Sequence, residues 1–333
     1  MSIETRPAGR TAARLSTLGI GAGTLGGNFS PPITSAEGSG IIADALDAGI
    51  SYVDTAPFYG YGKSERAVGD ALRARSGWTL STKVGRLLKP RTTPKDPNDG
   101  WYEPLPFQPV YDYSYDGVMR SFEDSLQRLG LDHIDLLYMH DIGAVTHGEA
   151  AHAELFKTAM DGGYKALDRL RSSGAVKSIG LGVNEWQVVA AAMQHGQWDN
   201  VLLAGRYTLL EQEPLHTLFP LCEKAGTTIV VGGPFNSGIL VGRDTWNYAR
   251  APQAVLDRVQ AIARVCDAHN VALPAAALRF PLGSAVVSSV IPGPRSRAEL
   301  AQILAWWRAE IPAALWSDLK TERLIDEASP VPA

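Results

Sequence analysis

A single (β/α)8 barrel of the TIM type, an α/β architecture, is the fold that this sequence predicts. Eight short segments rich in β-branched and apolar residues alternate with longer segments whose apolar residues recur at helical spacing, an order typical of parallel strands joined by helices. The length of 333 residues lies within the range of such barrels. No linker-like change in composition divides the chain, so we expect one domain over residues 1–333 rather than a doubly wound sheet with a second domain.

The predicted strands are short, and helices are predicted between them where apolar side chains repeat every three or four residues, for example at Val118, Phe122 and Leu129. Several helical segments end at a glycine, such as Gly49 and Gly174, which is a common helix stop. The eight predicted strands are, in chain order, Ser16–Ile20, Ser51–Asp54, Thr79–Val84, Ile134–Met139, Ser178–Val183, Val201–Ala204, Thr228–Val231 and Val286–Ile291.

One segment, Gly85–Ser114, follows the third predicted strand and interrupts the alternation. It is rich in proline and aromatic residues, and a loop of this length inside a compact domain is usually functional. Because barrel active sites lie at the C-terminal ends of the strands, we expect this long loop to cover the C-terminal mouth as a wall of a substrate pocket. The aromatic side chains expected to contact substrate are Trp101, Tyr102, Phe107 and Tyr113.

Composition and charge argue against several classes of protein. The 31 Lys and Arg against 35 Asp and Glu give a net charge of −4, without the basic cluster that binds nucleic acid or anionic membranes. Cys222 and Cys266 are too few and too distant for a disulfide framework or a cysteine-based zinc site. Met1 to Leu15 lacks the apolar core of a signal peptide, and no stretch approaches the roughly 18 apolar residues of a membrane span. We therefore expect a cytoplasmic protein that uses no metal and acts on small molecules.

The segment Gly21–Gly26 matches the pattern G-x-G-x-x-G after a predicted strand, and Asp54 ends the next strand where a Rossmann fold places a ribose-binding acid. That fingerprint requires a helix to begin at the third glycine. Pro31 and Pro32 follow instead, so we disfavour a Rossmann fold. We interpret the segment as a glycine-rich loop pressed against a ligand.

Ionisable side chains lie at three neighbouring strand ends. Lys83 sits in a strand that reads as buried, where an unpaired ammonium is costly to desolvate, so we expect an anionic partner. Asp54 and His140 end the adjacent strands. Each has a structural alternative, since Asp54 is suited to capping a turn, His140 to a satisfied place at a strand end, and Lys83 to a structural ion pair. Their convergence at one end of a barrel favours an active site.

Tyr59 lies in a loop five residues after Asp54. Such a tyrosine is ordinarily an aromatic surface contact. If Lys83 lies beside it, the positive charge draws the phenol, whose unperturbed pKa is about 10, toward ionisation. We therefore predict a proton donor and acceptor that works near neutral pH.

Several motifs, in chain order and over nearly the whole sequence, resemble the signature of the aldo-keto reductases. They are Asp54–Glu65 with Gly69, Ser81–Val84, Leu129–Leu136 with His140, Gly180–Asn184, and Val290–Ser296.

The resemblance implies a barrel that binds a nicotinamide cofactor in extended form without a Rossmann domain. It implies that Tyr59 is the general acid and base, that Lys83 lowers its pKa, that Asp54 pairs with Lys83, and that His140 orients the substrate oxygen. Asn184 would hold the nicotinamide carboxamide, and the loop Gly232–Gly238 would wrap the pyrophosphate. Apart from the family, Gly293 to Arg295 followed by a helix offers a helix N-terminus and a cation to a phosphate. The residues expected to contact cofactor are Gly23, Thr24, Asp54, Asn184, Tyr207, Gly232, Gly233, Pro234, Phe235, Asn236, Gly238, Gly293, Pro294, Arg295 and Glu299.

The sequence departs from the family pattern in three regions. Gly232 stands where many members carry a tyrosine that stacks on the nicotinamide, and Ala204 and Gly205 stand near a common glutamine. Glu299 stands where members that prefer NADP carry an arginine. A carboxylate there would repel a 2′-phosphate, so we expect a preference for NAD, while Arg295 leaves NADP open.

Within the family, the Pro-rich and aromatic loop resembles that of the sugar 1-dehydrogenases for L-fucose, L-galactose or D-arabinose, and of similar enzymes that oxidise pyridoxal. Both branches imply oxidation of a cyclic hemiacetal to a lactone. Our leading hypothesis is an NAD(P)-dependent aldose 1-dehydrogenase, and the alternative is a pyridoxal 4-dehydrogenase that forms 4-pyridoxolactone. A third hypothesis, a regulatory subunit that only binds cofactor, is disfavoured because a binder needs no tuned proton donor. The sequence does not distinguish a monomer from a homodimer.

Overall fold

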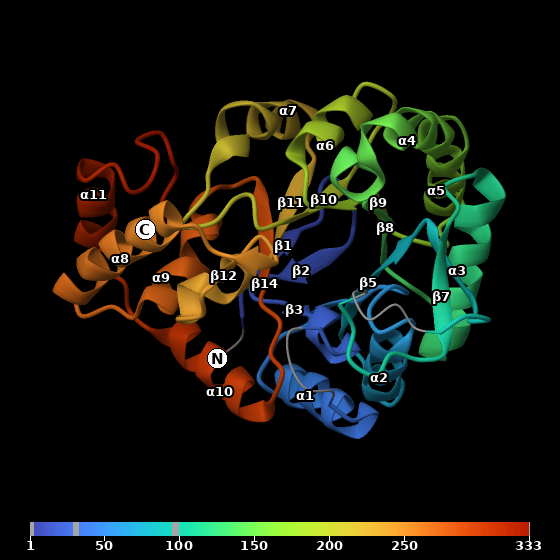
Figure 1. Ribbon diagram of the computed structural model, residues 1–333, viewed down its shortest axis with the longest axis horizontal. Helices are drawn as coiled ribbons and strands as arrows, with labels where there is room; N and C mark the ends of the chain where they lie inside the picture. Colours follow the sequence, from blue (N-terminus) through green and yellow to red (C-terminus); the bar gives the residue numbers. More distant parts are fainter. Residues whose placement is uncertain (1–2, 29–32, 95–99, 333) are drawn as a thin grey trace.

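The computed structural model describes residues 3–28, 33–94 and 100–332 and confirms the predicted barrel (Figure 1). Eight strands pair in parallel with their neighbours. The first and last strands meet through a parallel bridge between Leu18 and Val290. In order around the barrel, the strands are β3 (Ile20–Gly21), β4 (Tyr52–Asp54), β5 (Thr79–Val84), β8 (Leu136–His140), β9 (Ser178–Val183), β10 (Asn200–Ala204), β11 (Thr228–Gly232) and β14 (Val287–Ile291).

The first predicted strand, Ser16–Ile20, is wrong in its bounds, whereas the others begin and end within two residues of the observed strands. The chain at β2 (Arg14–Ser16) pairs antiparallel with β1 (Thr5–Pro7), and the barrel strand begins only at Ile20. Gly19 lies at the change of direction, where a Cβ would come within 2.8 Å of side chains of Tyr52 and Ile291. Leu15 in β2 packs on residues inside the barrel, so this hairpin closes the N-terminal end of the barrel.

Helices surround the strands (Figure 1), and their ends follow ordinary capping chemistry. The helix α1 begins with a capping box between Thr34 and Glu37, and α3 begins at the Ser114 cap and ends at Gly130 in the left-handed conformation. Within the described residues, none of the helices combines the length and hydrophobicity needed to cross a membrane. The helices are α1 (Ser35–Asp47), α2 (Lys63–Leu72), α3 (Tyr115–Leu129), α4 (Ala144–Thr158), α5 (Tyr164–Ser172), α6 (Trp186–Ala192), α7 (Leu218–Ala225), α8 (Gln253–Ala268), α9 (Leu273–Arg279), α10 (Arg297–Arg308) and α11 (Ala313–Thr321).

The segment Gly85–Ser114 contains an antiparallel hairpin of β6 (Arg86–Pro90) and β7 (Phe107–Tyr111), where the sequence predicted a loop. Residues 95–99 of this segment and Pro31 and Pro32 of the glycine-rich loop lie outside the described residues. Beyond the gap, Tyr102 N–H donates to the Gly27 carbonyl and Leu105 N–H to the Gly60 carbonyl, each at 3.1 Å. The segment therefore packs against the loops that follow β3 and β4, at the C-terminal end of the barrel.

Candidate functional site

A buried ion pair joins two of the strand ends that the sequence singled out. Lys83 on β5 donates from Nζ to Asp54 Oδ2 at 2.6 Å and to the Thr55 carbonyl at 2.9 Å. Both charged residues are at most 2% exposed, and Ser81 Oγ donates to the second carboxylate oxygen of Asp54 at 2.7 Å. Burial lowers the pKa of Lys83, but the charge of Asp54, helped by Tyr59 and by the hydrogen bonds to both residues, holds that pKa above its usual value. Lys83 is therefore a fixed positive charge inside the barrel.

Tyr59 lies over this charge, with Lys83 Nζ 4.7 Å from the centre of its ring. The glycine-rich loop supports the tyrosine from the other side. A Cβ on Gly23 would lie 3.6 Å from the Tyr59 ring, and a Cβ on Gly26 would come within 2.6 Å of the Gly60 nitrogen. The glycines of this motif thus permit close packing on the loop that carries Tyr59.

Lys83 draws Tyr59 toward ionisation, as predicted, but the expectation that this brings the pKa of the phenol down overall is wrong. Burial raises the pKa of the phenol, and although the charge of Lys83 lowers it, the balance leaves the pKa above its ordinary value. The reason is that the aromatic and glycine surroundings remove water from the phenol, which penalises the anionic form. Tyr59 is accordingly protonated at neutral pH in the free protein.

His140 ends β8 beside Tyr59, with the two rings edge to face and their centres 6.0 Å apart. The residue is 5% exposed. Burial, together with the charges of Arg86 and Lys83, holds the pKa of His140 well below its usual value, so the ring is neutral. Among the described residues, its Nδ1 has no hydrogen-bond partner.

Sequence reasoning missed a second buried ion pair next to this histidine. Arg86, at the start of β6, places Nη2 2.5 Å from Asp141 Oδ2, and the same oxygen lies 3.3 Å from His140 Nε2. The signal was available, because each charged residue lies two positions after the end of a predicted strand. Arg86 was instead treated as part of an undifferentiated loop.

The four aromatic residues predicted to contact substrate are not equivalent. Trp101 is 5% exposed and its ring centre lies 5.4 Å from that of Phe58 and 6.0 Å from that of Tyr59, which places its ring beside Tyr59. Tyr102 is 55% exposed, and Phe107 lies partly buried on β7.

The prediction for Tyr113 is wrong. Its side chain is 1% exposed and its hydroxyl donates to the carbonyl of His140 at 2.8 Å. The ring therefore lies in the core and supports the end of β8 from behind, so it presents no face to a ligand.

A cavity of about 210 Å³ opens beside Tyr59 and Asp54. The amide of Asn184 lines it together with Tyr248, and Tyr248 donates from its hydroxyl to Asn184 Oδ1 at 3.1 Å. Tyr248 comes from the hairpin of β12 (Thr245–Trp246) and β13 (Ala249–Arg250) and was not anticipated from the sequence. The predicted cofactor residues that line this cavity are Gly23, Thr24, Asp54, Asn184, Gly232, Gly233, Asn236 and Gly293.

A second cavity, of about 320 Å³, shares Thr24, Gly233 and Gly293 with the first and therefore adjoins it. The predicted cofactor residues that it adds are Pro234, Phe235, Gly238, Arg295 and Glu299. Pro294 lies at its edge, where its carbonyl accepts from Thr24 Oγ1 at 3.0 Å. Together the cavities form a path from Tyr59 to the start of α10.

Tyr207 is the one predicted cofactor contact that lies off this path, and the prediction is wrong. The residue is 0% exposed, and its ring packs on Phe219 and Phe280 at centre distances of 4.4 and 5.5 Å. The chain after β10 turns this ring into the core between strands and helices.

The path has the features that a nicotinamide dinucleotide requires. The loop after β11 carries three successive residues with positive φ, Asn236 (46°), Ser237 (61°) and Gly238 (104°), a backbone form that gathers N–H groups around anions. Arg243 and Arg295 bring positive charge to the same cavity. Gly232 lines the cavity beside Tyr59, and a Cβ there would come within 3.1 Å of Leu202, so a larger side chain would crowd this wall.

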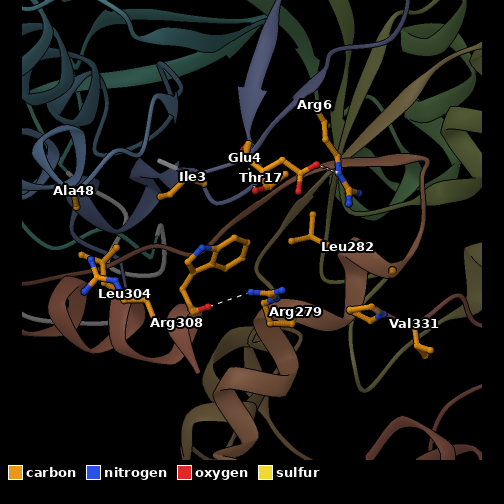
Figure 2. A pocket seen from close by; sticks show the side chains of 13 residues that line it. Ile3, Glu4, Arg6, Thr17, Ala48, Arg279, Leu282, Leu304, Arg308 and Val331 are labelled. Carbon is orange, nitrogen blue, oxygen red and sulfur yellow. Dashed lines mark hydrogen bonds and ion pairs between the residues drawn. The ribbon is translucent and has the colours of Figure 1, made fainter. Parts of the chain in front are cut away.

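A larger cavity, of about 690 Å³, does not belong to this site (Figure 2). It is lined by Thr17, Ala48 and Gly283, which precede β3, β4 and β14 and therefore lie at the N-terminal end of the barrel. In this cavity Arg279 Nη1 donates a hydrogen bond to the Trp307 carbonyl at 3.2 Å, next to Arg308 (Figure 2). None of the predicted site residues lines this cavity.

Comparison with known proteins supplies independent findings. Residues 17–321 match the Aldo/keto reductase family. The chain is 43% identical to the pyridoxal 4-dehydrogenase of Microbacterium luteolum over 97% of this chain and 98% of that one. It is 38% identical to the D-threo-aldose 1-dehydrogenase of a Pseudomonas species over 97% and 98% of the two chains. The solved glycerol dehydrogenase of Gluconobacter oxydans superimposes with a TM-score of 0.75 at 20% identity, covering 100% of this chain and 98% of that one, a likeness of fold.

Proposed function

Because the chain belongs to the aldo/keto reductase family, we propose that it is an NAD-dependent dehydrogenase that oxidises the hemiacetal carbon of a cyclic aldose to a lactone. Membership makes the protein an oxidoreductase that uses a nicotinamide cofactor. The observation that carries the proposal is the array of Asp54, Lys83 and Tyr59, in which a buried positive charge lies under a phenol at the edge of the cavity.

Oxidation removes a hydride from the hemiacetal carbon and a proton from its hydroxyl. The bound nicotinamide supplies the acceptor for the hydride. Tyr59 Oη takes the proton, and Lys83 Nζ stabilises the phenolate that must exist before that transfer. Asp54 keeps Lys83 charged and in place. The neutral imidazole of His140 holds the substrate oxygen, and the proton on Tyr59 later leaves to solvent.

The substrate is proposed from the walls of the site and from the relatives. Trp101 and Phe58 put aromatic surface beside Tyr59, and such surface packs on the apolar face of a sugar or on a pyridine ring. We propose an aldose of the L-fucose, L-galactose or D-arabinose type. Pyridoxal is the second candidate, favoured by the 43% identity to a pyridoxal 4-dehydrogenase.

The initial rate of NADH formation, with each of these four compounds and NAD⁺, tests the substrate. We expect turnover with at least one aldose. Turnover with pyridoxal alone would move the substrate to the second candidate, and no turnover with any compound would overturn the hemiacetal proposal.

The rate of oxidation should rise with pH. Burial holds the pKa of Tyr59 above its ordinary value, so near neutral pH only a small fraction is the phenolate that accepts the proton. Below that pKa this fraction grows about tenfold per pH unit, and we expect kcat/KM for oxidation to climb through the alkaline range. Reduction of the lactone, which needs the protonated phenol, should stay level up to that pKa and fall only above it. The pH profiles of both directions check this. A rate of oxidation that is flat or falls from neutral to alkaline pH would contradict the role of Tyr59.

Glu299 is proposed to set the preference for NAD. It accepts from the Arg295 backbone N–H at 2.8 Å and from Arg295 Nε at 3.0 Å, so the arginine that left NADP open is already paired. We expect Glu299→Gln to raise kcat/KM with NADP⁺ about tenfold relative to NAD⁺, because one repulsive charge is removed and Arg295 is freed for a phosphate.

Kinetics with both cofactors measure this ratio. The matched control is Glu322→Gln, at an exposed carboxylate after α11, which should leave the ratio unchanged. A higher kcat/KM with NADP⁺ than with NAD⁺ in the wild-type enzyme would contradict the proposed role of Glu299.

A further inference from the structure

The ion pair of Arg86 and Asp141 has no part in the proton transfer described above, yet it lies against the site. The Arg86 side chain is 3% exposed and that of Asp141 is 15% exposed. The free energy of desolvating a buried ion pair often exceeds the energy gained from its attraction. We therefore looked for a function of this pair in its position beside His140. One carboxylate oxygen of Asp141 lies between Arg86 Nη2, at 2.5 Å, and His140 Nε2, at 3.3 Å.

The backbone that carries Asp141 adopts a conformation that a non-glycine residue rarely takes, with φ of 45°. Three hydrogen bonds hold it there. Asp141 N–H donates to the Gly182 carbonyl at 2.9 Å, and the Tyr113 hydroxyl contacts the carbonyls of His140 at 2.8 Å and Asp141 at 3.2 Å. This left-handed turn directs the carboxylate back toward the ring of the preceding histidine.

Arg86 is held as firmly on the other side of the carboxylate. Its guanidinium carbon lies 4.1 Å from the centre of the Phe58 ring and 5.3 Å from that of Tyr111. The hairpin of β6 and β7 thus delivers a planar cation, stacked on aromatic rings, to Asp141 and within electrostatic range of His140.

We propose that Arg86 and Asp141 are positioning residues for His140: the Asp141 carboxylate lies against the Nε2 edge of the ring and limits its orientation, and Arg86 cancels the carboxylate charge so that the imidazole stays neutral. This rests on the proposed function, in which neutral His140 holds the substrate oxygen. A carboxylate alone beside an imidazole stabilises the charged imidazolium. An imidazolium in this place would repel Lys83 and compete with Tyr59 as the acid.

The electrostatic surroundings agree with this role. Burial, followed by the charges of Arg86 and Lys83, keeps the pKa of His140 well below its usual value, and burial raises the pKa of Asp141 against the pull of Arg86. The titratable and charged groups around the pair, from all the elements that pack there, are Asp54, Tyr59, Lys83, Arg86, Tyr111, Tyr113, His147 and Tyr248.

The test is a pH titration of the His140 ring by ¹⁵N NMR, with its signals identified by their loss in His140→Gln. The wild-type ring should stay neutral between about pH 8 and 5. In Arg86→Met, the unpaired carboxylate should bring proton uptake by the ring into that range. Arg86→Lys should restore the wild-type titration because it keeps the charge, and the double variant Arg86→Met with Asp141→Asn should return the ring to the neutral form. An Arg86→Met ring that stays neutral throughout would overturn the proposal.

Asp141→Asn provides a second test in case Arg86→Met does not fold. It removes the carboxylate beside Nε2 and should lower kcat by about ten- to a hundredfold through loss of ring position, with NAD⁺ affinity, followed by tryptophan fluorescence, unchanged. Wild-type kcat in this variant would overturn the positioning role. The NMR titration requires no substrate, so failure of the hemiacetal proposal would appear only as absent turnover and is distinguishable from failure of this one.

Discussion

Tyr59→Phe should lower kcat for oxidation by about two to four orders of magnitude, the range that general acid and base catalysis contributes, and leave NAD⁺ binding intact. Phenylalanine keeps the ring that packs on Gly23 and over Lys83 but removes the oxygen that accepts the proton. Initial rates of NADH formation measure the first effect, and quenching of tryptophan fluorescence by NAD⁺ measures the second.

The matched control for this variant is Tyr115→Phe, at a tyrosine on the surface that is 40% exposed. It should retain wild-type kcat. Turnover within a few fold of wild type in Tyr59→Phe would remove Tyr59 from the mechanism and, with it, the account of why Lys83 is buried there. A parallel loss of NAD⁺ binding would instead indicate a structural role.

The residues at strand ends could be predicted from the sequence because their geometry follows from the fold. Parallel strands end at the same edge, so Asp54, Lys83 and His140 had to converge once their strands were recognised. Lys83 was the most informative, since an ammonium in a buried strand requires a partner, and the structure supplies Asp54 at 2.6 Å. The fold and the core of the candidate site were therefore within reach of the sequence.

The remaining residues depend on loop geometry, which short-range patterns do not encode. Arg86 and Tyr248 reach the site on hairpins whose turns and register were not predicted. Asp141 reaches it through a positive φ, a conformation that aspartate tolerates better than most residues but that the sequence does not assign to this position.

The misplaced aromatic residues fail for a related reason. Tyr113 was predicted from the aromatic-rich loop and Tyr207 among the expected cofactor contacts, but only the path of the backbone decides which side of a loop faces the core. Burial also explains why the pKa of Tyr59 was expected to be too low. The sequence indicated the cation beside the phenol but not how much water burial removes around it.

The buried ion pair of Lys83 and Asp54 allows its contribution to stability to be separated from its contribution to activity. Lys83→Met leaves the Asp54 carboxylate buried without a counter-charge, and loss of one partner of such a pair costs about 3 to 5 kcal/mol. Asp54 has its pKa raised by burial even in the presence of Lys83. In the variant the carboxylate is therefore tolerated only when protonated, so stability is present at low pH and is lost as pH rises. Thermal unfolding at several pH values measures this deficit, which should be larger at pH 8 than at pH 5.

The double variant Lys83→Met with Asp54→Asn separates the two roles of the pair. It removes both charges, and replacing a whole buried pair with neutral groups is often without cost or stabilising, so most of the lost stability should return. Activity should not return, because the cation that stabilises the Tyr59 phenolate is absent, and kcat should stay at least about a hundredfold below wild type. Recovery of activity together with stability would mean that Lys83 serves the fold alone. Loss of activity in a stable double variant would mean that the protein retains a pair that is costly to bury because the reaction requires its charge.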